Sequence, residues 1–180
     1  MPNNALSEAL REAYASAPSD IVILHTLELR HPSFVDDDDS SIAIRVVRDN
    51  QNLTARMEAT APLNAGEMVE FIAMGFDLEL PPVDTVPVPE ISITLDNVSR
   101  EIVTHLDRAA ESQDKIEITY RPYLSDDFEG PQMDPPFTLV LTEVSADASR
   151  VTGKARMLDV GNKAFPSETY NALRFAGLTR

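Results

Sequence analysis

The chain contains no cysteine and no tryptophan, and it has only six glycines among 180 residues. The lack of cysteine excludes disulfides, thiolate metal sites and cysteine nucleophiles. None of the glycines forms the GxGxxG or GxxxxGK pattern, so a glycine-rich phosphate loop is excluded. Aromatic residues make up 6% of the chain, which leaves few rings for stacking against bases or sugars.

Positive charge is also scarce, with 15 Lys and Arg against 30 Asp and Glu, a formal net charge of −15. Such a surface repels phosphate, so we do not expect nucleic acid as a ligand. No apolar run approaches the roughly 20 residues that span a bilayer, and the N-terminus lacks the basic and apolar regions of a secretory signal. We therefore expect synthesis in a cytoplasm and no membrane insertion.

The remaining composition is that of a folded protein, with 43% apolar and 25% charged residues. A length of 180 residues suits one domain, and we treat residues 1–180 as a single unit. Alternating apolar residues predict seven strands, at 21–30, 42–48, 67–80, 90–95, 115–121, 137–144 and 151–158. Apolar residues at helical spacing predict helices over 5–16, capped by Asn4, and over 98–111.

This order of elements predicts an α+β fold: a mainly antiparallel β-barrel or sandwich with two flanking helices. We expect His31-Pro32 to end the first strand, the turn at 49–52 to form a hairpin, and Gly75 to mark a bulge or bend. In the first strand, His25 shares a face with apolar residues, while Thr26, Glu28 and Arg30 form a polar face.

Motifs for catalysis or metal binding are sparse. The three histidines form no HExxH or HxH pair. Four adjacent aspartates, Asp36 to Asp39, lack the spacing and the glycine of a calcium loop, so a solvated loop is favoured. No GxSxG, SxxK or Ser/His/Asp grouping is evident. We therefore predict no catalytic, metal or cofactor residue, and no enzyme.

Charge is distributed unevenly along the chain. Residues 150–180 hold six basic and two acidic residues, a net charge of +4, so the rest of the chain carries −19. This polarity suits head-to-tail contacts between copies, although the basic end could equally fold back onto its own acidic body. We predict a C-terminal docking arm over 160–180, with these candidate interface residues: Phe165, Tyr170, Leu173, Arg174 and Phe175.

Three runs of sequence resemble a prophage protein family that is encoded among the tail genes of siphophages. They are FDLELPPVDTVPVPEISITLDNVSREIVTHL, IEITYRPYLSDD and KARMLDVGNKAFPSETYNALRFAGL, and the resemblance extends from ALREAYASAP to the end. The same order of strand, proline segment, strand, helix and strand is similar to the N-terminal domain of tail-tip attachment proteins of lambda-like phages. Phe165-Pro166 matches a late motif of those proteins. They also carry a cysteine-rich iron–sulfur segment, which this cysteine-free chain cannot form.

The resemblance implies a structural role as a baseplate hub that joins the tail tube to the receptor-binding tip. It implies a small β-barrel of the tail-tube lineage, arranged in a ring around the DNA channel, with a trimer favoured and a hexamer as the alternative. The implied partners are the distal tail or tube protein, the tape measure and the central tip or receptor-binding protein. The implied location is the virion tail tip, with the host cytoplasm during assembly.

Acidic side chains fit a channel through which DNA passes without specific binding, because a negative wall repels phosphates. We take two acidic groups as channel-facing or neighbour-facing candidates: Asp36, Asp37, Asp38 and Asp39, and Asp126 and Asp127. Four other roles remain open: a distal tail ring, a tail-assembly factor, a two-carboxylate cell-wall hydrolase, and a small-ligand barrel with an enclosed apolar cavity.

Overall fold

The computed structural model describes residues 7–16, 21–36, 38–79, 90–96, 100–147 and 150–157. These residues form two helices and nine strands. The helices are α1 (Glu8–Ser16) and α2 (Arg100–Ala110). The strands are β1 (Ile23–Val35), β2 (Ser41–Val47), β3 (Leu53–Arg56), β4 (Met68–Ala73), β5 (Phe76–Glu79), β6 (Glu90–Asp96), β7 (Glu117–Leu124), β8 (Phe137–Ala146) and β9 (Arg150–Met157).

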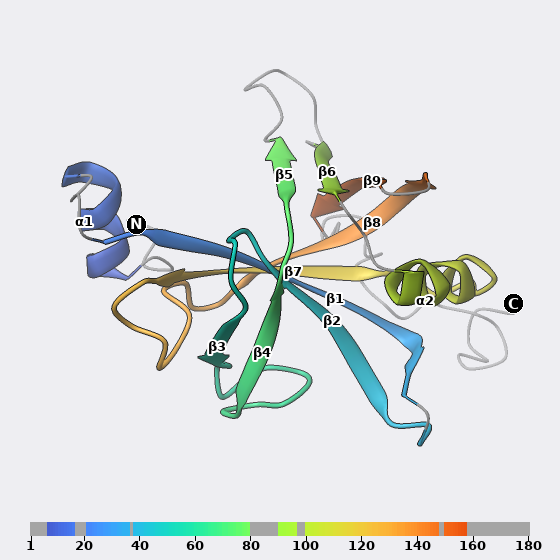
Figure 1. Cartoon of the computed structure of the whole chain (residues 1–180), viewed down its shortest axis with the longest axis horizontal. Coiled ribbons are helices and arrows are strands. Elements are labelled where there is room, and N and C mark those ends of the chain that lie inside the picture. Colours follow the sequence, from blue (N-terminus) through green and yellow to red (C-terminus); the bar gives the residue numbers. More distant parts are fainter. Residues whose placement is uncertain are drawn as a thin grey trace, which may run out of the picture.

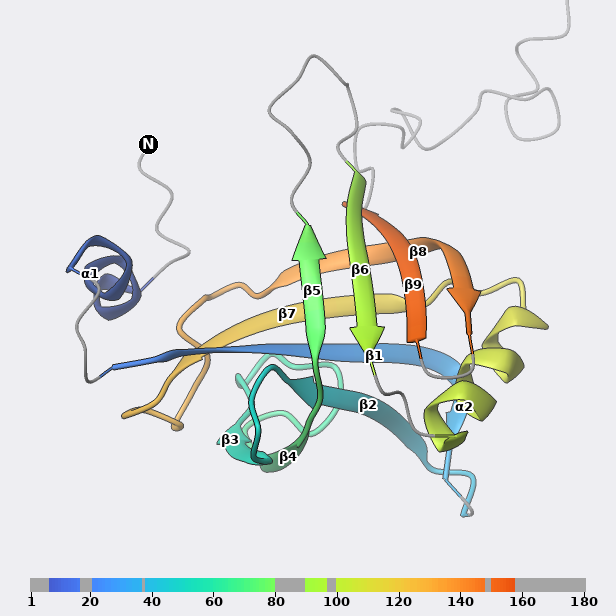
Figure 2. The same cartoon turned by 45° about the horizontal axis from the view of Figure 1, so that its top comes forward.

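The strands form one sheet in the order β3-β4-β2-β1-β7-β8-β9-β6-β5. Every neighbouring pair is antiparallel except β2 and β4, which are parallel. The sheet curls so that β5, β6 and β9 cross over β7, β1 and β2 (Figures 1 and 2). The predicted α+β class with two helices is confirmed. Of the two predicted architectures, barrel or sandwich, the barrel is wrong, because the sheet does not close and β3 and β5 form two separate edges.

A bend at Met74 and Gly75 explains how the sheet curls without closing. Met74 N–H donates to Val47 O (2.9 Å) at the end of β2, and Gly75 O accepts from Asp96 N–H (2.8 Å) at the end of β6. The segment predicted as one strand over 67–80 is therefore divided into β4, on one side of the curl, and β5, on the other. The bend expected at Gly75 is confirmed.

The first strand does not end at His31-Pro32, as the sequence predicted. β1 continues to Val35, and its register with β2 shifts between Arg30 and Val35. Its pairing with β7 stops at Arg30. Pro32 therefore occupies a stretch without regular pairing, where its missing N–H costs no ladder hydrogen bond.

The hairpin expected around residues 49–52 is also wrong. β2 forms its hairpin with β1, through residues 36–40, and its other neighbour is β4. Strand β3, whose four residues pair with β4 at the edge of the sheet, was not predicted from the sequence. So short a strand leaves almost no alternation pattern to detect.

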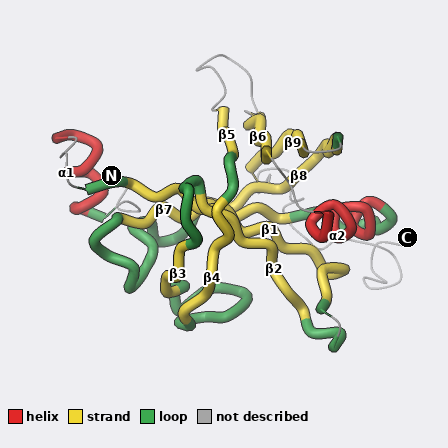
Figure 3. Tube along the Cα trace, viewed as in Figure 1, coloured by secondary structure: helices red, strands yellow, loops and turns green. Residues whose placement is uncertain are grey.

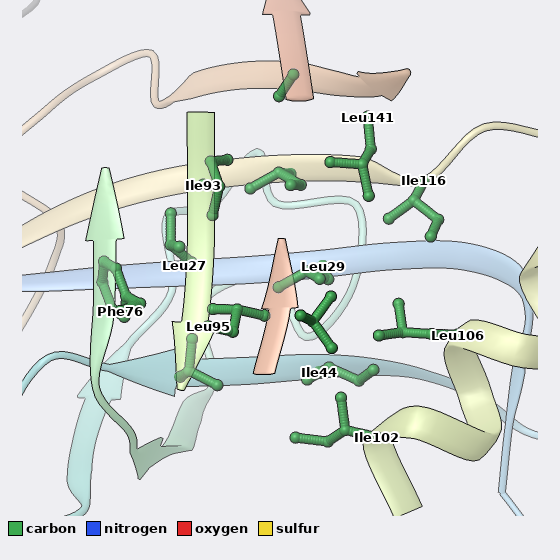
Figure 4. Close-up of a cluster of buried hydrophobic side chains, with 14 of the residues drawn as sticks. Leu27, Leu29, Ile44, Phe76, Ile93, Leu95, Ile102, Leu106, Ile116 and Leu141 are labelled. Carbon is green, nitrogen blue, oxygen red and sulfur yellow. The ribbon is translucent and has the colours of Figure 1, made fainter. Parts of the chain in front are cut away.

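The main hydrophobic core fills the inside of the curl (Figure 4). Leu27 and Leu29 of β1 face Ile93 and Leu95 of β6 across it. Helix α2 covers one end of the core through side chains that lie on one helical face: Ile102, Leu106 and Ala109. Helix α1 lies at the opposite end of the molecule (Figure 3).

Helix α1 begins at Glu8 because Ser7 caps it. Ser7 Oγ accepts a hydrogen bond from Leu10 N–H (3.1 Å), which satisfies one of the free donors of the first turn. Leu10 and Ala13 then pack against Leu124 of β7. Asn4, the cap expected from sequence, lies outside the described residues.

Candidate functional site

A cluster of charged side chains lies on the outer face of β2, β1 and β7. Thr26, Glu28 and Arg30 do share one face of β1, as the alternation predicted, but this face is not solvated. Glu28 of β1 and Arg121, on the neighbouring strand β7, are fully buried. The covering layer is the segment from β3 to β4, whose apolar residues form a second core with Val47 and Tyr123.

The loop between β3 and β4 brings Glu58 onto this face. Met57 N–H donates to Glu67 O (2.9 Å), and Gly66 N–H donates to Glu58 O (3.2 Å), so the loop closes on itself. Gly66 has a φ of 72°, a left-handed conformation that glycine adopts without strain. The loop thereby holds Glu58 above β7.

Arg121 joins two carboxylates from different parts of the chain. Its Nη1 lies 2.6 Å from Glu28 Oε2. Its Nε and Nη2 lie 2.7 and 2.8 Å from the two oxygens of Glu58, which is a bidentate pair. The side chain of Arg121 is 1% exposed and that of Glu28 is 0% exposed. The three side chains therefore connect β1, β7 and the covering loop in a water-poor environment.

Two further arginines surround Glu28. Arg30 Nε lies 3.5 Å from Glu28 Oε1, and Arg45 Nε lies 3.9 Å from Glu28 Oε2. Arg30 Nη2 also donates to Glu117 Oε2 (2.9 Å). The cluster thus places three arginines, Arg30, Arg45 and Arg121, beside three glutamates, Glu28, Glu58 and Glu117. Three of its buried atoms make no hydrogen bond within the described residues: Glu28 Oε1, Arg30 Nε and Arg45 Nε.

The electrostatics of the cluster keep its central pair charged. Burial alone would raise the pKa of Glu58, but the hydrogen bonds and positive charge of Arg121 lower it below its ordinary value. Burial alone would lower the pKa of Arg121, but Glu58 and Glu28 raise it. An arginine with a raised pKa does not exchange protons near neutral pH. The cluster therefore suits a permanent ionic clamp and not acid–base catalysis.

His25 lies on the apolar face of β1, as predicted, near the open end of the curl. Its Nδ1 is 2.7 Å from the hydroxyl of Tyr120 on β7. Burial and the positive charge of Arg48 lower the pKa of His25. Among the described residues, no group of three or more His, Asp or Glu is placed to hold a metal ion.

The structure does not bring the two predicted acidic groups together. Asp36, Asp38 and Asp39 are exposed after the end of β1, and Asp126 and Asp127 are exposed after the end of β7. Because β1 and β7 are antiparallel, the groups lie at opposite ends of a 13-residue strand. At the usual rise per residue they are roughly 40 Å apart. Asp37 lies outside the described residues.

The predicted interface residues of the docking arm also lie outside the described residues: Phe165, Tyr170, Leu173, Arg174 and Phe175. Another exposed apolar surface was overlooked. Met68 and Ile72, on the solvent-facing side of β4, are 46% and 49% exposed. The alternation along β4 separates the face with Met68 and Ile72 from the face with Val69 and Phe71, but the sequence did not tell which of the two faces would be covered.

The ionic clamp, in which Arg121 joins Glu28 and Glu58, was likewise overlooked. Glu28 and Arg121 are 93 residues apart, so no local pattern links them. The one feature of the sequence that could have indicated the clamp is the number of charged residues on strands whose opposite face is strongly apolar.

Comparison with known proteins identifies a family for the chain but no curated relative. No curated protein matches it. A family model described as a domain of unknown function, DUF1833, matches residues 9–170. None of the described helices is long and apolar enough to cross a membrane. The match covers every described strand and both clamp partners of Arg121, and so the chain belongs to the DUF1833 family.

Proposed function

We propose that this protein is a structural component of a siphophage tail tip, a baseplate hub that joins the tail tube to the receptor-binding tip. Three runs of its sequence resemble tail proteins, and this resemblance supports the role. The proposal includes an origin of the fold in the tail-tube lineage. A ring of copies would contact the tube on one side and the central tip on the other. The observation that carries the proposal is the exposure of two apolar side chains, Met68 and Ile72, beside the β3 edge of the sheet.

The contact surface consists of Met68, Glu70 and Ile72 on β4. Between them, Val69 and Phe71 point into the second core and fix the strand. Strand β3 pairs only with β4 among the described residues, so its outer edge is open for a further strand. Exposed apolar side chains beside an open strand edge are the features of a protein–protein contact.

The distribution of charge also supports a channel role. The acidic group after the end of β1 and the acidic group after the end of β7 are both exposed to solvent. A ring of copies would therefore present carboxylates at more than one height along its channel. Repulsion between these carboxylates and DNA phosphates would let the genome pass without binding.

The test begins with the oligomeric state of the full chain, measured by size-exclusion chromatography with light scattering. We expect a trimer, and a mass of six copies would favour the distal tail ring. The double variant Met68→Ser/Ile72→Ser should be a folded monomer, because it removes the apolar contact. Val22→Ser is the matched control, since Val22 is 58% exposed but lies outside this surface, and it should still assemble.

Deletion of residues 160–180 tests the docking arm separately and should also leave a folded monomer. If the truncated chain keeps its oligomeric mass, the arm is not needed. Mass spectrometry of purified tails then decides between a virion component and an assembly factor. A chain that is monomeric at high concentration and absent from complete tails would overturn the proposed function.

A further inference from the structure

The two ends of the curled sheet differ in how they are closed. At one end, α2 covers the core with Ile102, Leu106 and Ala109. At the other end, which lies nearer α1 (Figure 2), the described helices contribute one lining side chain, Tyr14. A pocket of about 370 Å³ opens there. We call this pocket the open mouth.

The walls of the open mouth come from both halves of the curl. Leu78 of β5 lies on one side, and Phe137 and Leu139 of β8 lie on the other. Leu78 and Phe137 are partly exposed and pack against the main core, so the mouth continues the apolar interior outwards. Its volume falls in the range of ligand pockets, which is roughly 300–1,000 Å³.

Polar groups converge on one side of the mouth. Tyr14 of α1, His25 of β1 and Tyr120 of β7 line this side, and the Tyr120 hydroxyl lies 2.7 Å from His25 Nδ1. The rings of His25 and Tyr120 are stacked, with centroids 5.9 Å apart. The hydrogen bond to Tyr120 uses His25 Nδ1, and His25 Nε2 makes no hydrogen bond within the described residues.

Arg48 adds a fixed positive charge to this side. Its backbone N–H donates to His25 O (2.9 Å), which places the residue directly beyond β2. Its Nη2 is 2.9 Å from Asp77 Oδ1, and both side chains are more than half exposed. That contact uses one of the five N–H groups of the guanidinium, so the side chain retains donors for a second acceptor.

We propose that the open mouth binds a small organic anion that has an apolar body and one carboxylate. The apolar body lies between Leu78 and Phe137, and the carboxylate accepts hydrogen bonds from Arg48 and the His25 ring. A neutral ligand would offer Arg48 only an uncharged acceptor, which forms a weaker hydrogen bond than a carboxylate does. A ligand with several negative charges would be repelled by Asp77 and by the acidic body of the chain.

Titration calorimetry of the full chain with three probes tests the ligand class. The probes are 3-phenylpropionate, its neutral amide 3-phenylpropanamide, and propionate, which lacks the ring. We expect 3-phenylpropionate to bind about tenfold more tightly than either of the others, because each lacks one half of the recognition. Amide NMR shifts on binding should concentrate at His25, Tyr120 and Phe137.

Arg48→Gln should weaken 3-phenylpropionate about tenfold and leave the affinity for the amide unchanged. Arg150→Gln is the matched control, because Arg150 also pairs with one exposed aspartate, Asp96, but lies near the closed end. It should change neither affinity. If Arg48→Gln fails to fold, as judged by circular dichroism, Arg48→Lys replaces it and should weaken 3-phenylpropionate severalfold.

Four results would overturn the proposal. The first is no binding of 3-phenylpropionate at millimolar concentration. The second is equal affinity for the acid and the amide. The third is an affinity for 3-phenylpropionate that does not change in the Arg48 variant. The fourth is a set of NMR shifts that falls outside the open mouth.

Discussion

The two faces of β2, β1 and β7 are both buried, but in different ways. Leu27, Leu29 and Ile118 on the inner face pack against the apolar residues of the main core. On the outer face, Glu28 and Arg121 are equally buried, yet they contact charged partners. Alternation along a strand therefore separates two faces but does not show which face meets water, because a second layer can cover either.

The two faces should also respond differently to mutation. On the inner face, each lost side chain removes its own dispersion and burial energy, and the neighbours relax partly into the space. On the outer face, the loss of one charge leaves its partners buried without compensation. The ionic face should thus be the more sensitive to loss of its central residue, Arg121.

The largest effect is expected for Arg121→Met. It leaves Glu28 and Glu58 without their central partner, and the free energy of unfolding should fall by about 4 kcal/mol. Urea denaturation followed by circular dichroism measures this change. Arg150→Met, which breaks an exposed pair with Asp96, should cost about 0.5 kcal/mol. Similar losses for the two variants would show that burial adds nothing to the Arg121 contacts.

A smaller effect is expected on the inner face, for Leu27→Ala. Leu27 is fully buried in the main core, and its truncation should lower the free energy of unfolding by about 3 kcal/mol. Val22→Ala, at an exposed site, should change it by less than about 0.5 kcal/mol. The comparison of the two faces breaks down if Leu27→Ala is more damaging than Arg121→Met in the same denaturation experiment.

The smallest effect is expected for Glu58→Gln, and it should depend on pH. The pKa of Glu58 is lowered in the folded protein, so the unfolded chain takes up its proton first as the pH falls below the ordinary value of 4.5. The stabilisation by Glu58 is therefore complete above that value and is lost below it. Glu58→Gln should cost about 1 kcal/mol near neutral pH.

Denaturation at several pH values checks this prediction. The difference between the natural chain and Glu58→Gln should shrink as the pH falls below 4.5. Glu129→Gln is the control, because Glu129 pairs with Arg56 at an exposed site and its loss should have little effect at any pH. A difference that stays constant down to acidic pH would mean that Glu58 is not held charged by Arg121.

Local sequence predicted much of the fold but little of the candidate site. The helix over α2, the alternating strands and the bend at Gly75 follow from residues that are neighbours in the chain. The clamp does not, because Glu28, Glu58 and Arg121 come from three separate segments. The open mouth likewise combines α1, β1, β5, β7 and β8, and only the placement of His25 on an apolar face hinted at it.

The sequence by itself determined the periodicity of the strands, the acidic surface and the lack of cysteine chemistry, because these depend on residue type and on near neighbours. Only the tertiary structure decided that β2 lies parallel to β4, that Pro32 sits within a strand, and that the charged face of β1 is buried. Each of these outcomes depends on which distant segment covers or pairs with a strand. That choice is made by the packing energy of the whole fold, which no local pattern contains.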